Sequence, residues 1–200
     1  MSAHGRFLQK AGYAVLMLDL RAHAHSEGNT IDGVQEVNDI LGAVDFIRSR
    51  PELDPGRIGA LGISLGARTI LHAARQSDSI RALVLEGLGP MNLDDHGGRP
   101  TTLRRRINYP INWLTYKFGD WIAGTSPASN SSALAALKRP LLYISSGHNK
   151  EQYFNRLLFA AASEPKEFWE IPGTRHASGY FKDNKAYAGK VTAFFDANLT

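Results

Sequence analysis

The sequence predicts one α/β domain over residues 1–200, built on a mostly parallel sheet flanked by helices. Short, continuous apolar runs recur along the chain, and such runs suit strands that are buried on both faces. Segments with apolar residues at helical spacing separate these runs. Strands that alternate with helices form a parallel sheet wrapped by helices. The length suits a single domain with a sizeable core.

The first half of the chain contributes three predicted strands and three predicted helices. Gly12 is a stop signal for the first helix, and prolines follow the second helix. The strands are Tyr13–Leu18, Ile58–Ile63 and Ile80–Leu85, and the helices are His4–Lys10, Asp32–Ser49 and one from Ala67 to about Gln76.

The second half begins with an insert over residues 87–139 that breaks this alternation. The insert is rich in Asn, Pro, Ser and aromatic residues, and we expect it to form a cap or lid on the domain. The alternation then resumes. The predicted strands are Leu141–Ser145 and Glu167–Ile171, and the predicted helices run over about Glu151–Ala162 and Asn184–Ala197.

Composition excludes several classes of protein. There is no cysteine, so disulfides, thiolate catalysis and cysteine-ligated zinc are excluded. The net charge is +4, but the basic residues are scattered apart from Arg104–Arg106, so we expect no nucleic-acid partner. The N-terminus has no apolar signal core and no run is long enough to span a membrane, so we expect a cytoplasmic protein.

The most informative motif is G-I-S-L-G at Gly62–Gly66. It lies between the predicted strand Ile58–Ile63 and a predicted helix. A serine on such a tight turn exposes its hydroxyl, and the flanking glycines allow the close backbone approach. We therefore predict that Ser64 is a nucleophile and that the N–H of Leu65 binds an oxyanion.

A serine nucleophile needs a base, and His176 is the best of the seven histidines. It follows the predicted strand Glu167–Ile171 through a short turn. Loops beyond the carboxyl ends of parallel strands share one rim of the sheet, which is where Ser64 also lies. His23 and His25 have a spacing that could suit a metal, but they lack a third ligand, so we expect no metal or other cofactor.

The base in turn needs a carboxylate to orient it. Glu151 is the only carboxylate in the segment that follows the predicted strand Leu141–Ser145. A negative residue in the first turn of a helix also has a structural explanation in the helix dipole. Glu86, at the end of the preceding strand, is the alternative acid.

Several segments, taken in order, resemble α/β hydrolases of the bacterial serine esterase and dienelactone hydrolase-like group. These segments are Gly12–Val15, Asp19–Gly28, Gly62–Gly66, Arg139–Ile144 and Ile171–His176. The resemblance covers nearly the whole chain except the insert. It implies the α/β-hydrolase fold, with Ser64 as nucleophile and His176 as base. In related chains a glutamate early in the segment after this strand is the acid, which supports Glu151.

The chain departs from this family in two ways. The family's loop usually reads D-x-R-G-x-G-x-S, whereas Ala22 and Ala24 stand at the two glycines. An alanine there is strained if its φ is positive. Relatives also have a strand between those that match Tyr13–Leu18 and Ile58–Ile63, and the loop after it supplies a second oxyanion N–H. We expect a fold that is short at its N-terminus.

Three explanations for the absent strand stay open at this point. The flanking strands could close on each other, another copy of the chain could supply the pairing in a homo-oligomer, or the sequence could belong to a longer protein. An unpaired central strand would leave buried backbone groups without partners.

The insert holds an aromatic segment that could line an acyl pocket. We expect Trp113, Tyr116 and Trp121 to contact substrate there. Packing of this helix on the body of the domain is an equal alternative. Docking on a membrane surface is a third reading, because Arg104–Arg106 precede the aromatic residues.

The sequence therefore predicts a serine esterase that cleaves small or medium-sized carboxylic esters. A thioesterase, lactonase or peptidase with the same triad is the alternative within enzymes. A non-catalytic binding protein with this fold is the alternative from another class.

Overall fold

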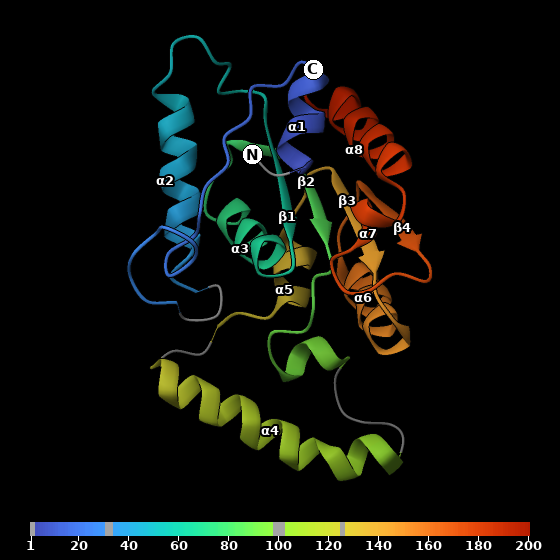
Figure 1. The fold of residues 1–200 in the computed structure, drawn as a ribbon. Helices are drawn as coiled ribbons and strands as arrows, with labels where there is room; N and C mark the ends of the chain where they lie inside the picture. Colours follow the sequence, from blue (N-terminus) through green and yellow to red (C-terminus); the bar gives the residue numbers. More distant parts are fainter. Residues whose placement is uncertain (1–2, 31–33, 98–102, 125–126) are drawn as a thin grey trace.

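The computed structural model describes residues 3–30, 34–97, 103–124 and 127–200 (Figure 1). Its centre is a four-stranded parallel sheet in the order β1-β2-β3-β4. The strands are β1 (Ile58–Ile63), β2 (Ile80–Glu86), β3 (Leu141–Ser146) and β4 (Lys166–Ile171). The predicted parallel α/β architecture is confirmed, and all four carboxyl ends lie at one edge of the sheet.

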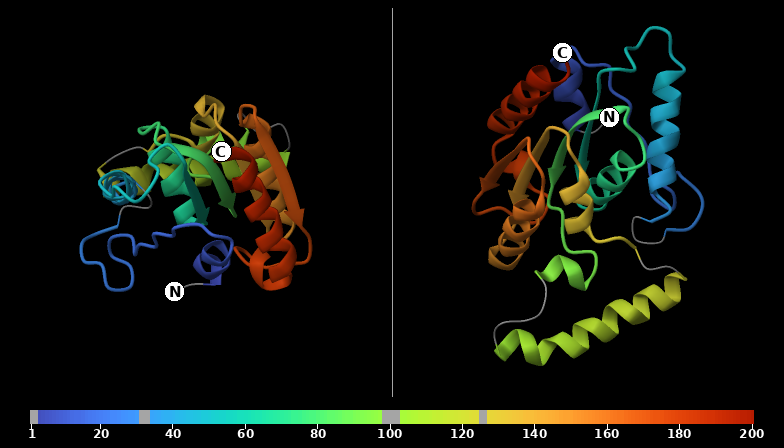
Figure 2. Two further views of the ribbon diagram at one scale, coloured as in Figure 1. Left: turned by 90° about the horizontal axis from the view of Figure 1, so that it is seen from above. Right: turned by 180° about the vertical axis from the view of Figure 1, so that it is seen from behind.

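Helices cover both faces of this sheet (Figures 1 and 2). On one face, apolar residues of α2 (Val37–Arg48), α3 (Leu65–Ala74), α5 (Asn130–Ala136) and α6 (Asn149–Ala161) share a core with the strands. On the other face, α1 (Ala3–Lys10) and α8 (Asn184–Asn198) do the same, and the short helix α7 (Gly179–Lys182) precedes α8.

Burial on both faces explains the apolar runs in the two central strands, β2 and β3. Leu83 and Leu85 of β2 belong to the core under α3, whereas Ala82 and Val84 belong to the core under α8. Successive side chains of a strand point to opposite faces, so a strand covered on both faces needs an apolar residue at every position. All six residues of β3 are buried, and its two polar residues, Ser145 and Ser146, form hydrogen bonds with Asn155 and Glu86.

The predicted first strand, Tyr13–Leu18, is wrong. The segment runs extended beside β1 but pairs with no described strand (Figure 1). Leu16, Met17 and Leu18 are 41%, 44% and 40% exposed. An apolar run indicates only that a segment favours burial. A strand also needs a neighbouring strand for its backbone hydrogen bonds. A groove separates this segment from β1 instead.

The loop after this segment contains strained backbone. Ala22 and Ala24 have φ angles of 58° and 47°, so both lie in the left-handed region. These are the two positions where the resembled family has glycine. An alanine in this conformation costs roughly 1–2 kcal/mol relative to a relaxed backbone. Arg21 holds the loop in place, since its backbone N–H and its guanidinium both bond to Asp39 of α2.

The helix expected over Asp32–Ser49 begins later, at Val37, and residues 31–33 lie outside the described part of the chain. The insert comprises the 3-10 turn η1 (Leu93–His96), α4 (Leu103–Ala123) and α5. α4 lies apart from the sheet, beyond its carboxyl edge (Figures 1 and 2). Among the described helices, none has both the length and the apolar character that crossing a membrane requires.

Candidate active site

Ser64 sits on a strained turn between β1 and α3. Its φ is 54° and its ψ is −114°, a combination that non-glycine residues rarely adopt. Gly62 makes the turn possible, because a Cβ there would lie 2.5 Å from the carbonyl oxygen of Gly66. The N–H of Ser64 donates to the carbonyl of Glu86 at 2.8 Å, which fixes the turn against the end of β2.

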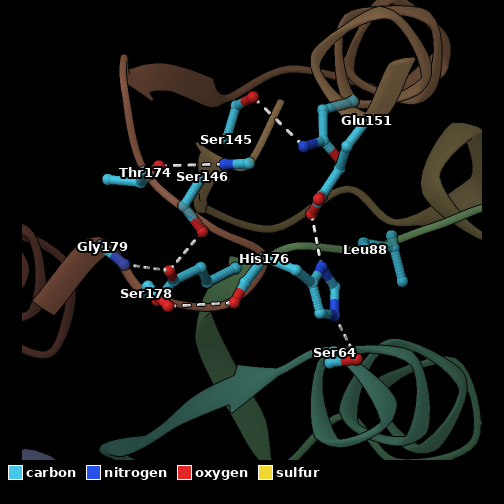
Figure 3. Close-up of polar contacts among 12 residues, drawn as sticks. Ser64, Leu88, Ser145, Ser146, Glu151, Thr174, His176, Ser178 and Gly179 are labelled. Atoms are coloured by element: carbon cyan, nitrogen blue, oxygen red, sulfur yellow. Dashed lines mark hydrogen bonds and ion pairs between the residues drawn. The ribbon is translucent and has the colours of Figure 1, made fainter. Parts of the chain in front are cut away.

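His176 lies in the loop between β4 and α7 and joins Ser64 to Glu151 (Figure 3). Its Nε2 is 2.8 Å from the Ser64 hydroxyl oxygen, and its Nδ1 is 2.5 Å from Oε1 of Glu151. An ionised carboxylate only accepts hydrogen bonds, so Nδ1 carries the proton. Nε2 is then free to accept the proton of the serine hydroxyl, which is the arrangement a general base requires.

Glu151 reaches His176 from the first turn of α6, folding back over Gly147. Gly147 has a φ of 138°, and a Cβ there would lie 2.1 Å from Oε2 of Glu151. Gly87 borders the same space, because its Cβ would lie 3.2 Å from Cε1 of His176. Two glycines with positive φ therefore make room for the acid and the base.

Thr174 ties the loop of the acid to the loop of the base (Figure 3). Its hydroxyl accepts the N–H of Gly147 at 3.0 Å and donates to the carbonyl of Ile171 at 2.8 Å. The residue is buried. The sequence analysis did not identify Thr174, and a threonine in a turn gives no signal that distinguishes this role.

Glu86, the alternative acid, does not bond to His176 in the structure. Its buried carboxylate accepts hydrogen bonds from Ser146 Oγ at 2.5 Å, Gly179 N at 2.8 Å and Tyr187 OH at 2.8 Å. Burial and the neighbouring Glu86 carboxylate raise the pKa of Tyr187, so this phenol stays protonated and donates. Glu86 thus links three parts of the chain: the segment after His176, which contains Gly179, the end of β3 and the helix α8.

His72 and His4 make contacts that explain them as structural residues. His72 bonds to Asn130 Oδ1 at 2.9 Å, and burial lowers its pKa. His4 packs against aromatic rings of α7 and α8, and burial also lowers its pKa. In the described ranges, no group of three or more His, Asp or Glu residues is placed to hold a metal, so nothing adds a third ligand to His23 and His25.

Leu65 is the first residue of α3. The first four N–H groups of a helix have no acceptor within the helix, and the helix dipole makes that end favourable for negative charge. The N–H of Leu65 is therefore suited to bind an oxyanion beside Ser64.

The three aromatic residues expected to contact substrate are on α4. The Tyr116 hydroxyl is 3.0 Å from Nε2 of His96 in η1, so this side of α4 faces the body of the domain. Trp113 and Trp121 are 47% and 76% exposed. The described contacts do not join these three residues to Ser64, and their role in substrate binding stays a prediction.

Asp95 joins the two ends of the insert, and the sequence analysis missed it. Its buried carboxylate accepts the backbone N–H groups of Met91, Asn130 and Ser131 at 2.7, 3.0 and 2.7 Å. An acidic residue in a loop of mixed composition looks solvent-exposed in sequence. Its bonds across the insert bring the two ends of the cap together.

Comparison with known proteins gives a family match and several relatives. The model of the X-Pro dipeptidyl-peptidase (S15) family matches residues 1–170. The uncharacterised protein PA2218 of Pseudomonas aeruginosa is 24% identical over 252 residues, which cover 98% of this chain and 68% of that protein. The thiohydrolase aneE of Aspergillus aculeatus is 34% identical over 79 residues, which cover 38% of this chain and 25% of that protein.

Among solved structures, the Pyrococcus furiosus esterase Pf2001 has the same fold, with a TM-score of 0.70. It is 24% identical, and the match covers 97% of this chain and 74% of that one. The family match spans most of the chain, and the parallel sheet with its serine turn is the architecture the sequence resemblance implied. The chain belongs to the X-Pro dipeptidyl-peptidase (S15) family, a hydrolase family within the α/β-hydrolase superfamily.

Proposed function

We propose that this protein is a serine hydrolase that cleaves carboxylic esters of small to medium size through an acyl-enzyme. One observation carries the proposal: Ser64, His176 and Glu151 form a continuous hydrogen-bonded chain of 2.8 and 2.5 Å. The three residues lie in the segments that follow the carboxyl ends of three different strands, β1, β4 and β3. Ser64 adopts a strained backbone conformation, and Gly147 and Gly87 leave room for the side chains of Glu151 and His176. These requirements favour a functional explanation over chance proximity.

The proposed reaction follows from these positions. Ser64 Oγ attacks the ester carbonyl carbon while Nε2 of His176 takes the hydroxyl proton, and Glu151 stabilises the imidazolium that forms. The negative carbonyl oxygen lies towards the N–H of Leu65. The tetrahedral intermediate then releases the alcohol, whose oxygen receives the proton from His176.

Water completes the cycle. It attacks the acyl-enzyme carbonyl, His176 takes a proton from the water, and Ser64 leaves with that proton as the carboxylic acid is released. The His176 side chain is 52% exposed, so water can reach the base. None of these steps uses a cofactor or a metal.

A substrate series tests this proposal. We expect hydrolysis of p-nitrophenyl acetate and butyrate, and we expect Ser64→Ala to lower kcat by a factor of about 10⁴ or more, because the nucleophile is lost. Ser49→Ala, which removes an exposed hydroxyl bonded only to its own helix, is the matched control and should keep full activity. Ester hydrolysis that survives Ser64→Ala would rule out this mechanism.

Two other activities of the same triad deserve a parallel assay. The similarity to a thiohydrolase supports a thioesterase, and the family name supports cleavage of X-Pro peptides. Butyryl thioesters and Ala-Pro-p-nitroanilide test these activities, and the highest kcat/KM identifies the preferred bond. A folded protein inactive on all three classes would favour the non-catalytic binding protein instead.

A further inference from the structure

We propose that Asn155 is a positioning residue for the triad: its buried hydrogen bonds to β3 fix the start of α6, so that Glu151 meets Nδ1 of His176. The inference rests on the proposed function, because Glu151 is the acid of that triad. Asn155 lies four residues after Glu151 in α6. Residues four apart lie on one face of a helix, one turn from each other, so the bonds that hold Asn155 also place Glu151.

Asn155 is fully buried, and both polar atoms of its amide are bonded to β3. Nδ2 donates to the Ser145 hydroxyl at 3.1 Å (Figure 3), and Oδ1 accepts from the Tyr143 hydroxyl at 3.2 Å. Burial, together with the carboxylates of Asp95 and Glu151, raises the pKa of Tyr143, so this phenol stays protonated and donates. The amide is therefore satisfied by partners on a rigid central strand.

The same network reaches the segment that follows β2. The Tyr143 hydroxyl shares its one proton between the amide and the carbonyl oxygen of Leu88, which lies 2.9 Å away. Gly87, the preceding residue, borders both the acid and the base. A Cβ there would lie 3.2 Å from Cε1 of His176 and 3.5 Å from Oε1 of Glu151. The network thus holds the helix of the acid and the backbone against which the acid and base pack.

Burial alone does not explain an asparagine at this position. Asn155 and Leu158 are the two buried residues of α6. An apolar side chain at position 155 would be buried more favourably than an amide, whose bonds to β3 replace bonds to water. The amide adds direction, because a hydrogen bond restricts both distance and angle and a buried network specifies one arrangement.

The start of α6 has little else to place it against the sheet. His148 is the N-cap residue, and its side chain makes no capping bond to the helix. His148, Asn149 and Lys150 are all exposed. The N–H of Glu151 bonds to the carbonyl of His148 at 2.8 Å, which forms the turn but does not orient it. Asn155 is the first buried residue of the helix after the acid.

NMR of the His176 ring nitrogens tests the inference without turnover. The partner of one ring nitrogen decides which of the two carries the proton, so the ¹⁵N shifts report whether Glu151 is in place. His176→Gln identifies the His176 signals among the seven histidines. At a pH where the ring is neutral, we expect the proton on Nδ1 in the parent protein. Asn155→Leu should show a substantial population with the proton on Nε2.

Steady-state kinetics on p-nitrophenyl butyrate gives the second readout. Misplacing a reacting group by about 1 Å can cost about 10²-fold, so Asn155→Leu should lower kcat by about 10- to 100-fold. KM should stay within about twofold, because the acid acts on the transition state rather than on bound substrate.

Three further variants separate position from stability. Ser145→Ala and Tyr143→Phe each remove one hydroxyl from the network and add no volume, so both should fold and should change the two readouts in the same direction as Asn155→Leu. Leu158→Val is the matched control. It truncates the next buried residue of α6 and removes no hydrogen bond, so the tautomer and kcat should match the parent protein. Circular dichroism checks that each variant is folded.

Two results would overturn the inference. The first is a set of network variants that keep the parent tautomer and kcat. The second is a loss in Leu158→Val as large as in Asn155→Leu, which would show that the rate follows the stability of α6. Failure of the proposed function looks different. A parent protein that cleaves no ester, but carries the proton on Nδ1 and loses it in Asn155→Leu, would support the positioning role and remove the ester reaction.

Discussion

The two edge strands of the sheet, β1 and β4, differ in charge and in what lies beside them. β4 carries charges along its length, and Glu167 and Glu170 form ion pairs with Lys190 of α8 and Arg156 of α6. β1 carries no charge, and the apolar segment Tyr13–Leu18, which forms no strand, lies across a groove from it. Charged residues on an edge strand are a common protection against pairing with other chains. The difference is that β4 has this protection and β1 lacks it.

The candidate triad connects these two sides of the molecule. Acid and base belong to the β3–β4 side, where Thr174 and Glu86 hold their loops through buried hydrogen bonds. The nucleophile belongs to β1, and one backbone bond joins its turn to β2. We therefore expect substitutions on the β3–β4 side to have large effects on rate or stability, and substitutions at the N-terminal segment to have small ones.

Among the substitutions that compare the two sides, Glu151→Gln should have the largest effect on rate. The amide carries no charge to stabilise the imidazolium, and its NH₂ group can donate to Nδ1 and favour the tautomer with the proton on Nε2, so kcat should fall by about 10³–10⁴. The melting temperature should hardly change, because glutamine has nearly the same shape and volume as the glutamate it replaces. Steady-state kinetics on a p-nitrophenyl ester gives the rate. A loss below about tenfold would show that another group orients the base.

Glu86→Gln should affect stability most. The carboxylate accepts three hydrogen bonds while fully buried, from Ser146 and Gly179 at Oε1 and from Tyr187 at Oε2. Glutamine keeps one acceptor oxygen, and its NH₂ group replaces the other and cannot accept the bonds made there. We expect a loss of about 2–4 kcal/mol in the free energy of unfolding, measured in urea. Glu167→Gln, at a surface ion pair, should cost less than about 1 kcal/mol. Equal losses for the two variants would contradict the view that buried hydrogen bonds to Glu86 hold the β3–β4 side of the molecule together.

Ala22→Gly and Ala24→Gly should each stabilise the protein by about 1 kcal/mol, because glycine adopts a positive φ without the Cβ clash. Ala14→Gly is the control. Ala14 has no such φ, and the greater freedom of glycine in the unfolded chain should destabilise that variant. Thermal unfolding in the absence of ligand measures all three. A destabilised Ala22→Gly would show that its backbone is not strained.

The smallest effect is expected from Tyr13→Phe, and it should appear only at alkaline pH. Burial and the hydrogen bond to Asp196 raise the pKa of the Tyr13 phenol to about 12. A raised folded-state pKa contributes stability that is complete below the unfolded value near 10 and is lost as the pH rises towards 12. Tyr13→Phe should therefore flatten the decline of stability between pH 10 and 12. If stability falls equally steeply with pH in Tyr13→Phe and in the parent protein, ionisation of the Tyr13 phenol does not contribute to that fall.

Most of the fold follows from local patterns in the sequence. The four strands that form are mainly apolar where they face a helix layer, and the helices between them have apolar residues at helical spacing. The serine turn is predictable for a steric reason, since Gly62 must lie against the backbone of Gly66. Tyr13–Leu18 has the same apolar pattern and forms no strand, because pairing depends on a neighbour that a local pattern does not record.

The candidate site is predictable in part for a similar reason. Ser64, His176 and Glu151 follow strand ends, and parallel strands bring their carboxyl ends to one rim. Thr174, Glu86 and Asp95 act through hydrogen bonds to backbone groups far along the chain. Such bonds depend on how loops approach one another, and nothing in the residue type or its spacing reports that approach.

The most direct test of the proposed site is labelling with a fluorophosphonate, read by intact mass. A serine reacts with this probe when a base activates it and an oxyanion site receives the phosphonyl oxygen. We predict one adduct on the parent protein and none on Ser64→Ala, with both proteins folded by circular dichroism. No adduct on the folded parent protein, or an adduct that persists on Ser64→Ala, would contradict the assignment of Ser64 as an activated nucleophile.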